Sequence, residues 1–251
     1  MYYPQKYDKK RLLIELAEKY EDREYFKEDP IIFPKQYSVI QDIEISGLLS
    51  SVLSFGNRKQ IVKKCRELDD LMDNKPYKFI RDGKYYQWKD NNKTFYRFIK
   101  YSDLYDICGM IDSIYQQFYT LEEIVINQKR QYPNFPIVHL LCNFMNCAGK
   151  INGIPYPNES NACKRMNMFL RWMVRKNSPV DIGCWQQVLS KELYIPLDVH
   201  VGNTARELGL INRKSNDWKT VVEITNNLKE IFPDDPCKGD FALFGYDYYK
   251  E

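Results

Sequence analysis

Apolar residues recur at the three- and four-residue spacing of an α-helix through most of the 251-residue chain. One interval departs from this pattern: residues 78–101 contain short aromatic-rich runs separated by Asp-Gly and Asn-Asn, which is typical of a small β-hairpin. We therefore expect an all-α fold with one small β-hairpin between helices. The expected helices cover residues 11–20, 42–72, 101–128, 136–146, 161–176, 201–211 and 218–232.

Composition and length exclude several classes of protein. Apolar residues make up 44% and charged residues 28% of the chain, which are ordinary globular values, and length alone allows one large domain or two small ones. No window approaches the roughly 18 apolar residues of a membrane span, and the N-terminus lacks the apolar core of a signal peptide. We expect a cytoplasmic protein that does not bind membranes.

The sequence offers no motif for a cofactor. It has no glycine-rich phosphate loop, which disfavours a nucleotide cofactor. Its seven cysteines are scattered, and the closest pair, Cys142 and Cys147, has no second pair at zinc-ligand spacing. Neither a metal nor any other cofactor is expected. The net charge of +3 neither requires nor excludes a nucleic-acid partner, so an argument for such a partner depends on where the charges lie.

The segment 160–176 carries five basic residues and no acidic residue. On a helix, Lys164, Arg171 and Arg175 share one stripe, which would suit a phosphate backbone, although a merely solvated face has the same spacing. If Ser160 caps this helix, Lys164 lies near its positive end, where an ammonium is disfavoured and an amine nucleophile or a phosphate contact is favoured. On the opposite side Phe169, Leu170 and Met173 should face the core.

Asp198 precedes another predicted helix and is either a helix cap only or also a group that does chemistry. Aspartate is a favoured helix N-cap, so the structural interpretation is strong, but a capping carboxylate is held rigidly and can also be catalytic. His200 follows two residues later, without a serine or cysteine partner in a recognisable motif. Asp181, which follows Pro179, is most simply another N-cap.

Several segments together resemble a known family. The stretch 196–201, "PLDVHV", and the following "RELGL" resemble the "P-V-D-T-H-V" and "R-L-G-L" elements of the helix-hairpin-helix DNA glycosylase superfamily, and residues 42–71 resemble its "L-L-S-x-Q-T" helix pair. More narrowly, "DPIIFP", "GNRKQI", "CKRMNMFLRWMVR" and "DFALFGY" look like an uncharacterised bacterial family within it, of the DUF2400 type. Departures are "PNESNACKR" in place of the usual hairpin turn and an apparent insertion at 176–194.

The resemblance implies a glycosylase-like fold in which subdomains 38–155 and 1–37 plus 156–251 meet at a cleft, with Lys164 and Asp198 facing each other across it. It also implies a chemistry. Lys164 would attack the sugar's anomeric carbon as the base leaves, forming a Schiff base, and Asp198 would activate the amine or stabilise the cationic sugar. The implied activity is excision of a damaged base, with an oxidised purine as the leading candidate and possible strand cleavage.

The implied partner of a monomeric enzyme is double-stranded DNA with a damaged base, which must be rotated out of the duplex. A DNA-binding protein of the same fold without turnover, and an unrelated helical enzyme acting on a small molecule, remain alternatives. The expected DNA contacts are Asn57, Arg58, Arg165, Arg171, Arg175 and His200. The candidates for stacking on the base, each of which is also a natural core residue, are Phe55, Trp172, Trp185, Phe241 and Phe244.

Overall fold

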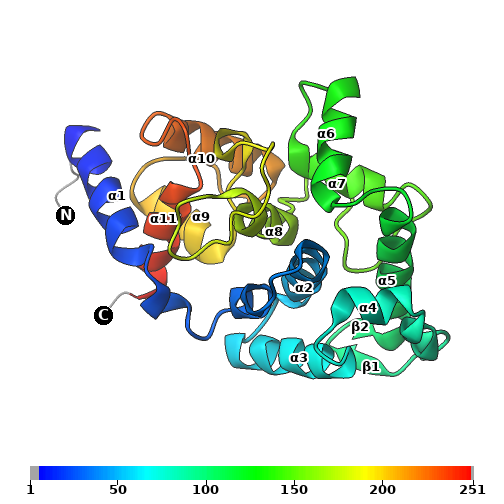
Figure 1. The fold of residues 1–251 in the computed structure, drawn as a ribbon. Helices are drawn as coiled ribbons and strands as arrows, with labels where there is room; N and C mark the ends of the chain where they lie inside the picture. The colour runs from blue at the N-terminus through cyan, green and yellow to red at the C-terminus, as the bar shows by residue number, and fades with distance from the viewer. Residues whose placement is uncertain (1–5, 250–251) are drawn as a thin grey trace. The chain divides into compact units, whose positions relative to one another are not determined.

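The computed structural model describes residues 6–249 and confirms the mostly helical fold with one small β-hairpin (Figure 1). Residues 1–5, part of the N-terminus examined for a signal peptide, lie outside the described residues. The chain forms two compact units. The residues up to Phe26 and from Asn158 on make the first unit, and Lys27–Pro157 makes the second. The sequence placed these boundaries at 37/38 and 155/156.

The first unit is built around three helices that are far apart in the sequence. Helix α11 (Lys238–Tyr248) packs against both α1 (Lys6–Tyr20) and α9 (Val199–Glu207), and Figure 1 shows the three side by side. Gly245 of α11 lies against the Tyr20 ring, so any side chain there would collide with it. The unit also contains α8 (Lys164–Val174), α10 (Trp218–Lys229) and the 3₁₀ turns η1 (Arg23–Phe26) and η5 (Ser190–Glu192).

Two helices of the first unit begin where the sequence predicted, and a third does not. Asp198 caps α9 as expected, and Asp217 caps α10 by accepting a hydrogen bond from the Thr220 amide at 2.9 Å. Helix α8 instead begins after Cys163, whose φ of +49° is left-handed and which makes no side-chain cap bond. The predicted cap, Ser160, is wrong because its hydroxyl bonds to Asn158.

Helix α2 (Ile40–Leu53) is a deeply buried helix of the second unit. Its residues are buried on nearly every face, including Glu44, whose carboxylate accepts hydrogen bonds from the Leu121 amide and the Tyr115 hydroxyl. Such pairing offsets the cost of burying a carboxylate. Helix α2 packs against η2 (Pro30–Ile32), η3 (Pro34–Gln36), α3 (Arg58–Leu71) and α4 (Pro76–Arg81). The unit also contains η4 (Lys84–Trp88), α5 (Tyr101–Tyr115), α6 (Leu121–Gln131) and α7 (Ile137–Met145).

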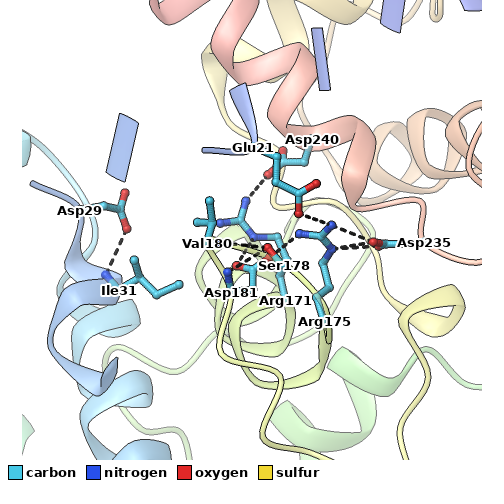
Figure 2. Close-up of polar contacts among 10 residues, drawn as sticks. All are labelled: Glu21, Asp29, Ile31, Arg171, Arg175, Ser178, Val180, Asp181, Asp235 and Asp240. Atoms are coloured by element: carbon cyan, nitrogen blue, oxygen red, sulfur yellow. Dashed lines mark hydrogen bonds and ion pairs between the residues drawn. The ribbon is translucent and has the colours of Figure 1, made fainter. Parts of the chain in front are cut away.

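The helical periodicity over 42–72 belongs to two helices, as the resemblance to a helix pair implied. The chain leaves α2 after Leu53 and turns through Gly56, whose φ of +97° suits glycine. Asn57 then starts α3 by accepting hydrogen bonds from the backbone amides of the first turn. A similar aspartate cap starts η2, where Asp29 Oδ1 accepts a hydrogen bond from the Ile31 amide at 3.1 Å (Figure 2).

The hairpin lies within the predicted interval, but its turn is at neither the Asp-Gly nor the Asn-Asn pair. Strands β1 (Thr94–Tyr96) and β2 (Ile99–Lys100) pair antiparallel, and the chain reverses through Arg97 and Phe98. The Asp-Gly pair is instead used earlier, where Gly83 with φ +70° precedes η4. Within residues 6–249, no helix has both the length and the apolar character that crossing a membrane requires.

Candidate functional site

Lys164 and Asp198 lie together in the first unit. Lys164 is the first residue of α8, Asp198 immediately precedes α9, and their Nζ and Oδ2 atoms are 3.3 Å apart. The side chains are 37% and 16% exposed, so the amine is open to solvent while the carboxylate is more enclosed. An amine and a carboxylate at this separation can exchange a proton and share a reacting centre.

Asp198 is held at three points, which leaves one oxygen for Lys164. Its Oδ1 accepts a hydrogen bond from the Val201 amide at 2.9 Å, and its carbonyl oxygen accepts bonds from the Gly202 amide and the Asn216 side chain. The preceding Leu197 is buried. The capping bond therefore fixes the carboxylate and directs Oδ2 toward the amine.

The loop before Lys164 is also fixed by side chains. The Asn161 carboxamide accepts a hydrogen bond from the Cys163 amide at 2.9 Å, and the Asn167 side chain donates to the Ala162 carbonyl at 3.1 Å. These bonds support the left-handed conformation of Cys163, which a residue other than glycine adopts at a cost. The loop that departs from the expected hairpin turn thus determines where α8 begins and where Lys164 lies.

Arg171 and Arg175 do not form the expected basic surface. They are only 5% and 2% exposed, and Figure 2 shows both guanidinium groups among carboxylates. The prediction of a phosphate-binding stripe is wrong for these two residues, because each successive turn of α8 lies deeper in the unit. The predicted core residues opposite them, Phe169, Leu170 and Met173, are buried as expected.

The two arginines share four carboxylates drawn from four different segments. Arg171 pairs with Asp181 at 3.2 Å and with Asp240 at 2.6 Å. Arg175 pairs with Asp181, with Asp235 at 2.7 Å and with Glu21 at 2.8 Å. Burial acts to lower the pKa of Arg175, but the carboxylates outweigh it and hold that pKa above its usual value.

Both guanidinium groups also lie over the Phe241 ring, 4.5 Å from its centroid for Arg171 and 5.0 Å for Arg175. These contacts add cation–π attraction to the ion pairs. Asp181, predicted as a helix cap, starts no helix and instead bridges the two arginines. It is the residue that the sequence interpretation most clearly missed.

Asp240 connects this network to the candidate site. It is 3% exposed, and its Oδ1 atom has no hydrogen-bond partner among the described residues. Burial raises the pKa of Asp240 to about 6 against the lowering effect of Arg171, and the nearby charge of Asp198 raises it further. The protonation of Asp240 is therefore coupled electrostatically to the carboxylate beside Lys164.

His200 lies on the same helix end as Asp198. Its Nδ1 atom is 2.7 Å from Asp247 Oδ2 on α11, and its ring meets Phe244 and Tyr248 edge-on. Phe244 and Tyr248 stack on each other with centroids 5.0 Å apart. His200 therefore ties α9 to α11, and its side chain stays 42% exposed. Phe244 is the half-buried member of the predicted aromatic set in this unit.

Three of the predicted stacking residues are core residues. Trp172, Trp185 and Phe241 are at most 2% exposed, so the prediction that they face a flipped base is wrong, because large aromatic rings contribute most when fully buried. Phe55 lies in the second unit and contacts two further rings there, those of Tyr96 and Phe98.

The remaining predicted DNA contacts fall in both units. Arg165, beside Lys164, is half-buried, and burial lowers its pKa below the usual value. Asn57 and Arg58 start α3 in the second unit, with Asn57 exposed and acting as the cap. Among residues 6–249, no three histidine, cysteine or acidic side chains are arranged to hold a metal ion.

Comparison with known proteins identifies a family. The family model described as "Protein of unknown function (DUF2400)" matches residues 29–249, and because this match spans most of the chain, the chain belongs to that family. The chain matches no curated protein and no solved structure. Membership of the helix-hairpin-helix DNA glycosylase superfamily is not supported by these findings, and that assignment is corrected to DUF2400. The motifs behind it were short helix caps and turns, which recur in unrelated helical proteins.

Proposed function

We propose that this member of the DUF2400 family excises a damaged base from DNA, with Lys164 as the nucleophile and Asp198 as the group that moves its proton. The observation that carries the proposal is the 3.3 Å separation between Lys164 Nζ and Asp198 Oδ2, in a pair whose carboxylate is fixed and whose amine is open to solvent. An oxidised purine is the leading candidate base, and the cytoplasm is the proposed location.

The chemistry needs a neutral amine next to a carboxylate. Lys164 Nζ forms a bond to C1′ of the nucleoside while the bond from C1′ to the base nitrogen breaks, and the departing base keeps that electron pair. One N–H proton passes to the base, with Asp198 as the carrier. Ring opening places a further proton from solvent on the sugar O4′ and leaves a protonated Schiff base between Lys164 and C1′.

The same intermediate allows strand cleavage. A proton passes from C2′ to solvent, the C2′=C3′ double bond forms, and the C3′–O bond breaks, so that the 3′-phosphate leaves with that electron pair. Water then hydrolyses the C=N bond and restores the amine. Asp198 also serves the first step electrostatically, because its negative charge stabilises the positive charge that develops on the sugar as the base departs. The proposed enzyme is therefore a bifunctional glycosylase and lyase.

Base release and strand cleavage on defined duplexes test this proposal. The duplexes carry 8-oxoguanine, uracil, hypoxanthine or an abasic site, and the variants are Lys164→Gln and Asp198→Asn. The matched control is Lys219→Gln, because Lys219 is also a partly exposed, ion-paired lysine of the first unit, 2.7 Å from Glu159.

We expect product from at least one duplex with the wild type and with Lys219→Gln. Lys164→Gln should release no base, and Asp198→Asn should lose about 100-fold or more in rate, as expected for a general acid–base group. Equal product from the wild type and Lys164→Gln would rule out the proposed nucleophile. Duplex binding without product from any lesion would favour the alternative of a DNA-binding protein without turnover.

A further inference from the structure

We infer that the second unit carries its own binding surface for an unpaired base of a DNA strand, formed by the stacked rings of Phe55 and Phe98 and by the basic residues around them. We call the two rings the Phe55–Phe98 platform. The choice of DNA as the strand rests on the proposed function, but the surface lies wholly within the second unit and its binding does not require Lys164.

The platform exposes an aromatic ring that the fold alone does not require. Phe98 lies in the hairpin turn and is 54% exposed. Its ring is stacked on that of Phe55, with centroids 4.5 Å apart and planes inclined by 19°. The Tyr96 ring also packs against Phe55, with centroids 5.0 Å apart. A supported aromatic ring is thus left largely exposed to solvent, and a nucleobase can stack on such a ring.

Backbone features hold the two turns together. The Tyr96 hydroxyl donates a hydrogen bond of 2.6 Å to the Phe55 carbonyl. Gly56 adopts φ +97°, and a Cβ atom there would lie 2.7 Å from Arg97 Nε. Arg97 itself has φ +52°, a left-handed conformation that is costly for a residue with a side chain. Strained backbone of this kind persists where the surroundings fix it, and it is concentrated at functional sites.

The two segments that meet at the platform are strongly basic. Residues 54–64 and 91–100 contain no acidic residue. Of the flanking acids, Glu67 pairs with Lys64 and Asp103 accepts a hydrogen bond from the Lys100 amide, whereas Asp90, immediately before the second segment, is exposed. Lys64 also lies 4.6 Å from the Phe95 ring centroid, which joins α3 to β1. The basic residues of the two segments are Arg58, Lys59, Lys63, Lys64, Lys93, Arg97 and Lys100.

Five of these cations are exposed and make no ion pair within residues 6–249: Lys59, Lys63, Lys93, Arg97 and Lys100. Lone cations around a stacked aromatic pair fit a strand that offers phosphates at regular spacing and bases with flat faces. A neutral ligand would leave the cations unused. An anionic membrane surface would also attract exposed aromatic and basic side chains, and the experiment separates it.

Binding of a labelled 20-nucleotide single strand, measured by fluorescence anisotropy, tests the inference. The key variant is Phe98→Ala, and Phe98→Trp is the conservative variant. The matched control is Phe135→Ala, because Phe135 is equally exposed at 54% and lies in the same unit against one other ring. Unfolding midpoints in urea verify that each variant is folded. RNA of the same sequence and vesicles of phosphatidylserine and phosphatidylcholine are the competing partners.

We expect Phe98→Ala to weaken DNA binding about tenfold or more, with Phe98→Trp and Phe135→Ala near the wild type. The double change Lys59→Gln with Lys63→Gln should reduce the salt dependence of log K by about 1.4, from two phosphate contacts on a single strand. Equal weakening in Phe98→Ala and Phe135→Ala would overturn the platform. Binding only to RNA or only to vesicles would overturn the choice of partner. Lys164→Gln should bind the single strand as the wild type does, because Lys164 lies outside the platform. Loss of strand binding in Phe98→Ala therefore tests the platform, and loss of base release in Lys164→Gln tests the proposed chemistry.

Discussion

Asp198 uses its two carboxylate oxygens for different tasks: Oδ1 caps helix α9 through the Val201 amide, and Oδ2 lies 3.3 Å from Lys164 Nζ. The capping bond stabilises the helix, whereas the contact with the amine serves the proposed chemistry, and one side chain makes both. The cap also fixes the carboxylate, so the position of Oδ2 depends little on side-chain motion.

The two roles of Asp198 can be separated by substitution. Asparagine is about as good an N-cap as aspartate, whereas alanine is not. Asp198→Asn should therefore keep the unfolding free energy within about 0.5 kcal/mol and lose activity, and Asp198→Ala should lose activity together with about 0.5–2 kcal/mol of stability. Urea unfolding and excision rates check this. Asp217→Asn makes the same change at the cap of α10, and activity lost equally there would argue against a specific role for Asp198.

Removing one buried arginine should destabilise the first unit. Arg175→Met leaves Asp181, Asp235 and Glu21 without their shared partner, and we expect a loss of about 3–5 kcal/mol in unfolding free energy. The comparison is Arg11→Met, which removes an exposed pair with Glu15 and should cost about 0–1 kcal/mol. Similar unfolding midpoints for the two variants would contradict the buried network.

The raised pKa of Asp240 predicts a stability that depends on pH. Between an unfolded pKa of about 4 and the folded pKa of about 6, the folded state holds the extra proton, so its stability falls as pH rises through this window. The slope is at most about 1.4 kcal/mol per pH unit for one proton. Urea unfolding at pH 5 and pH 7 should show greater stability at pH 5, and Asp240→Asn should reduce the difference. Burial also raises the pKa of Asp69 in the second unit to about 6, and Asp69 accounts for the pH dependence that remains in Asp240→Asn. An unchanged difference in Asp240→Asn would contradict the assignment to Asp240.

Gly183 should not tolerate a side chain. Its φ is +64°, and a Cβ atom would lie 2.6 Å from the Arg175 carbonyl oxygen, which is backbone and cannot move aside cheaply. Gly183→Ala should destabilise the protein by more than about 1 kcal/mol and displace the loop that carries Asp181. Gly149→Ala is the control with open space around it, although its φ is also positive. A smaller loss at Gly183 than at Gly149 would contradict the tight packing.

Local features of the fold followed from local sequence. The helical periodicity, the Asp198 cap and the core face of α8 were predicted because each depends on residues within one or two turns of each other. The break between α2 and α3 does not show in the apolar periodicity, which continues through it. Only the family resemblance placed a turn between two helices at Asn57 and Arg58, and the conformations of Gly56 and Asn57 mark that turn in the structure.

The site depended on contacts that sequence spacing does not contain. Arg171 and Arg175 looked like a surface stripe because their partners lie elsewhere in the sequence: Glu21, Asp181, Asp235 and Asp240 come from four segments. A basic stripe without nearby acids has the same pattern whether it meets phosphate or buried carboxylates. Phe98 was missed for the opposite reason, since an aromatic residue in an apolar run resembles a core residue until its exposure is seen.

Borohydride trapping on duplexes that carry an abasic site tests the central claim most directly. Hydride adds to the carbon of the C=N bond and makes the bond between the protein and the DNA permanent, and mass spectrometry of the digested adduct locates the modified residue. We predict a covalent adduct on Lys164 that is absent from Lys164→Gln and present in Lys219→Gln. An adduct that persists in Lys164→Gln, or the absence of any adduct despite base release by the wild type, would contradict the proposed mechanism.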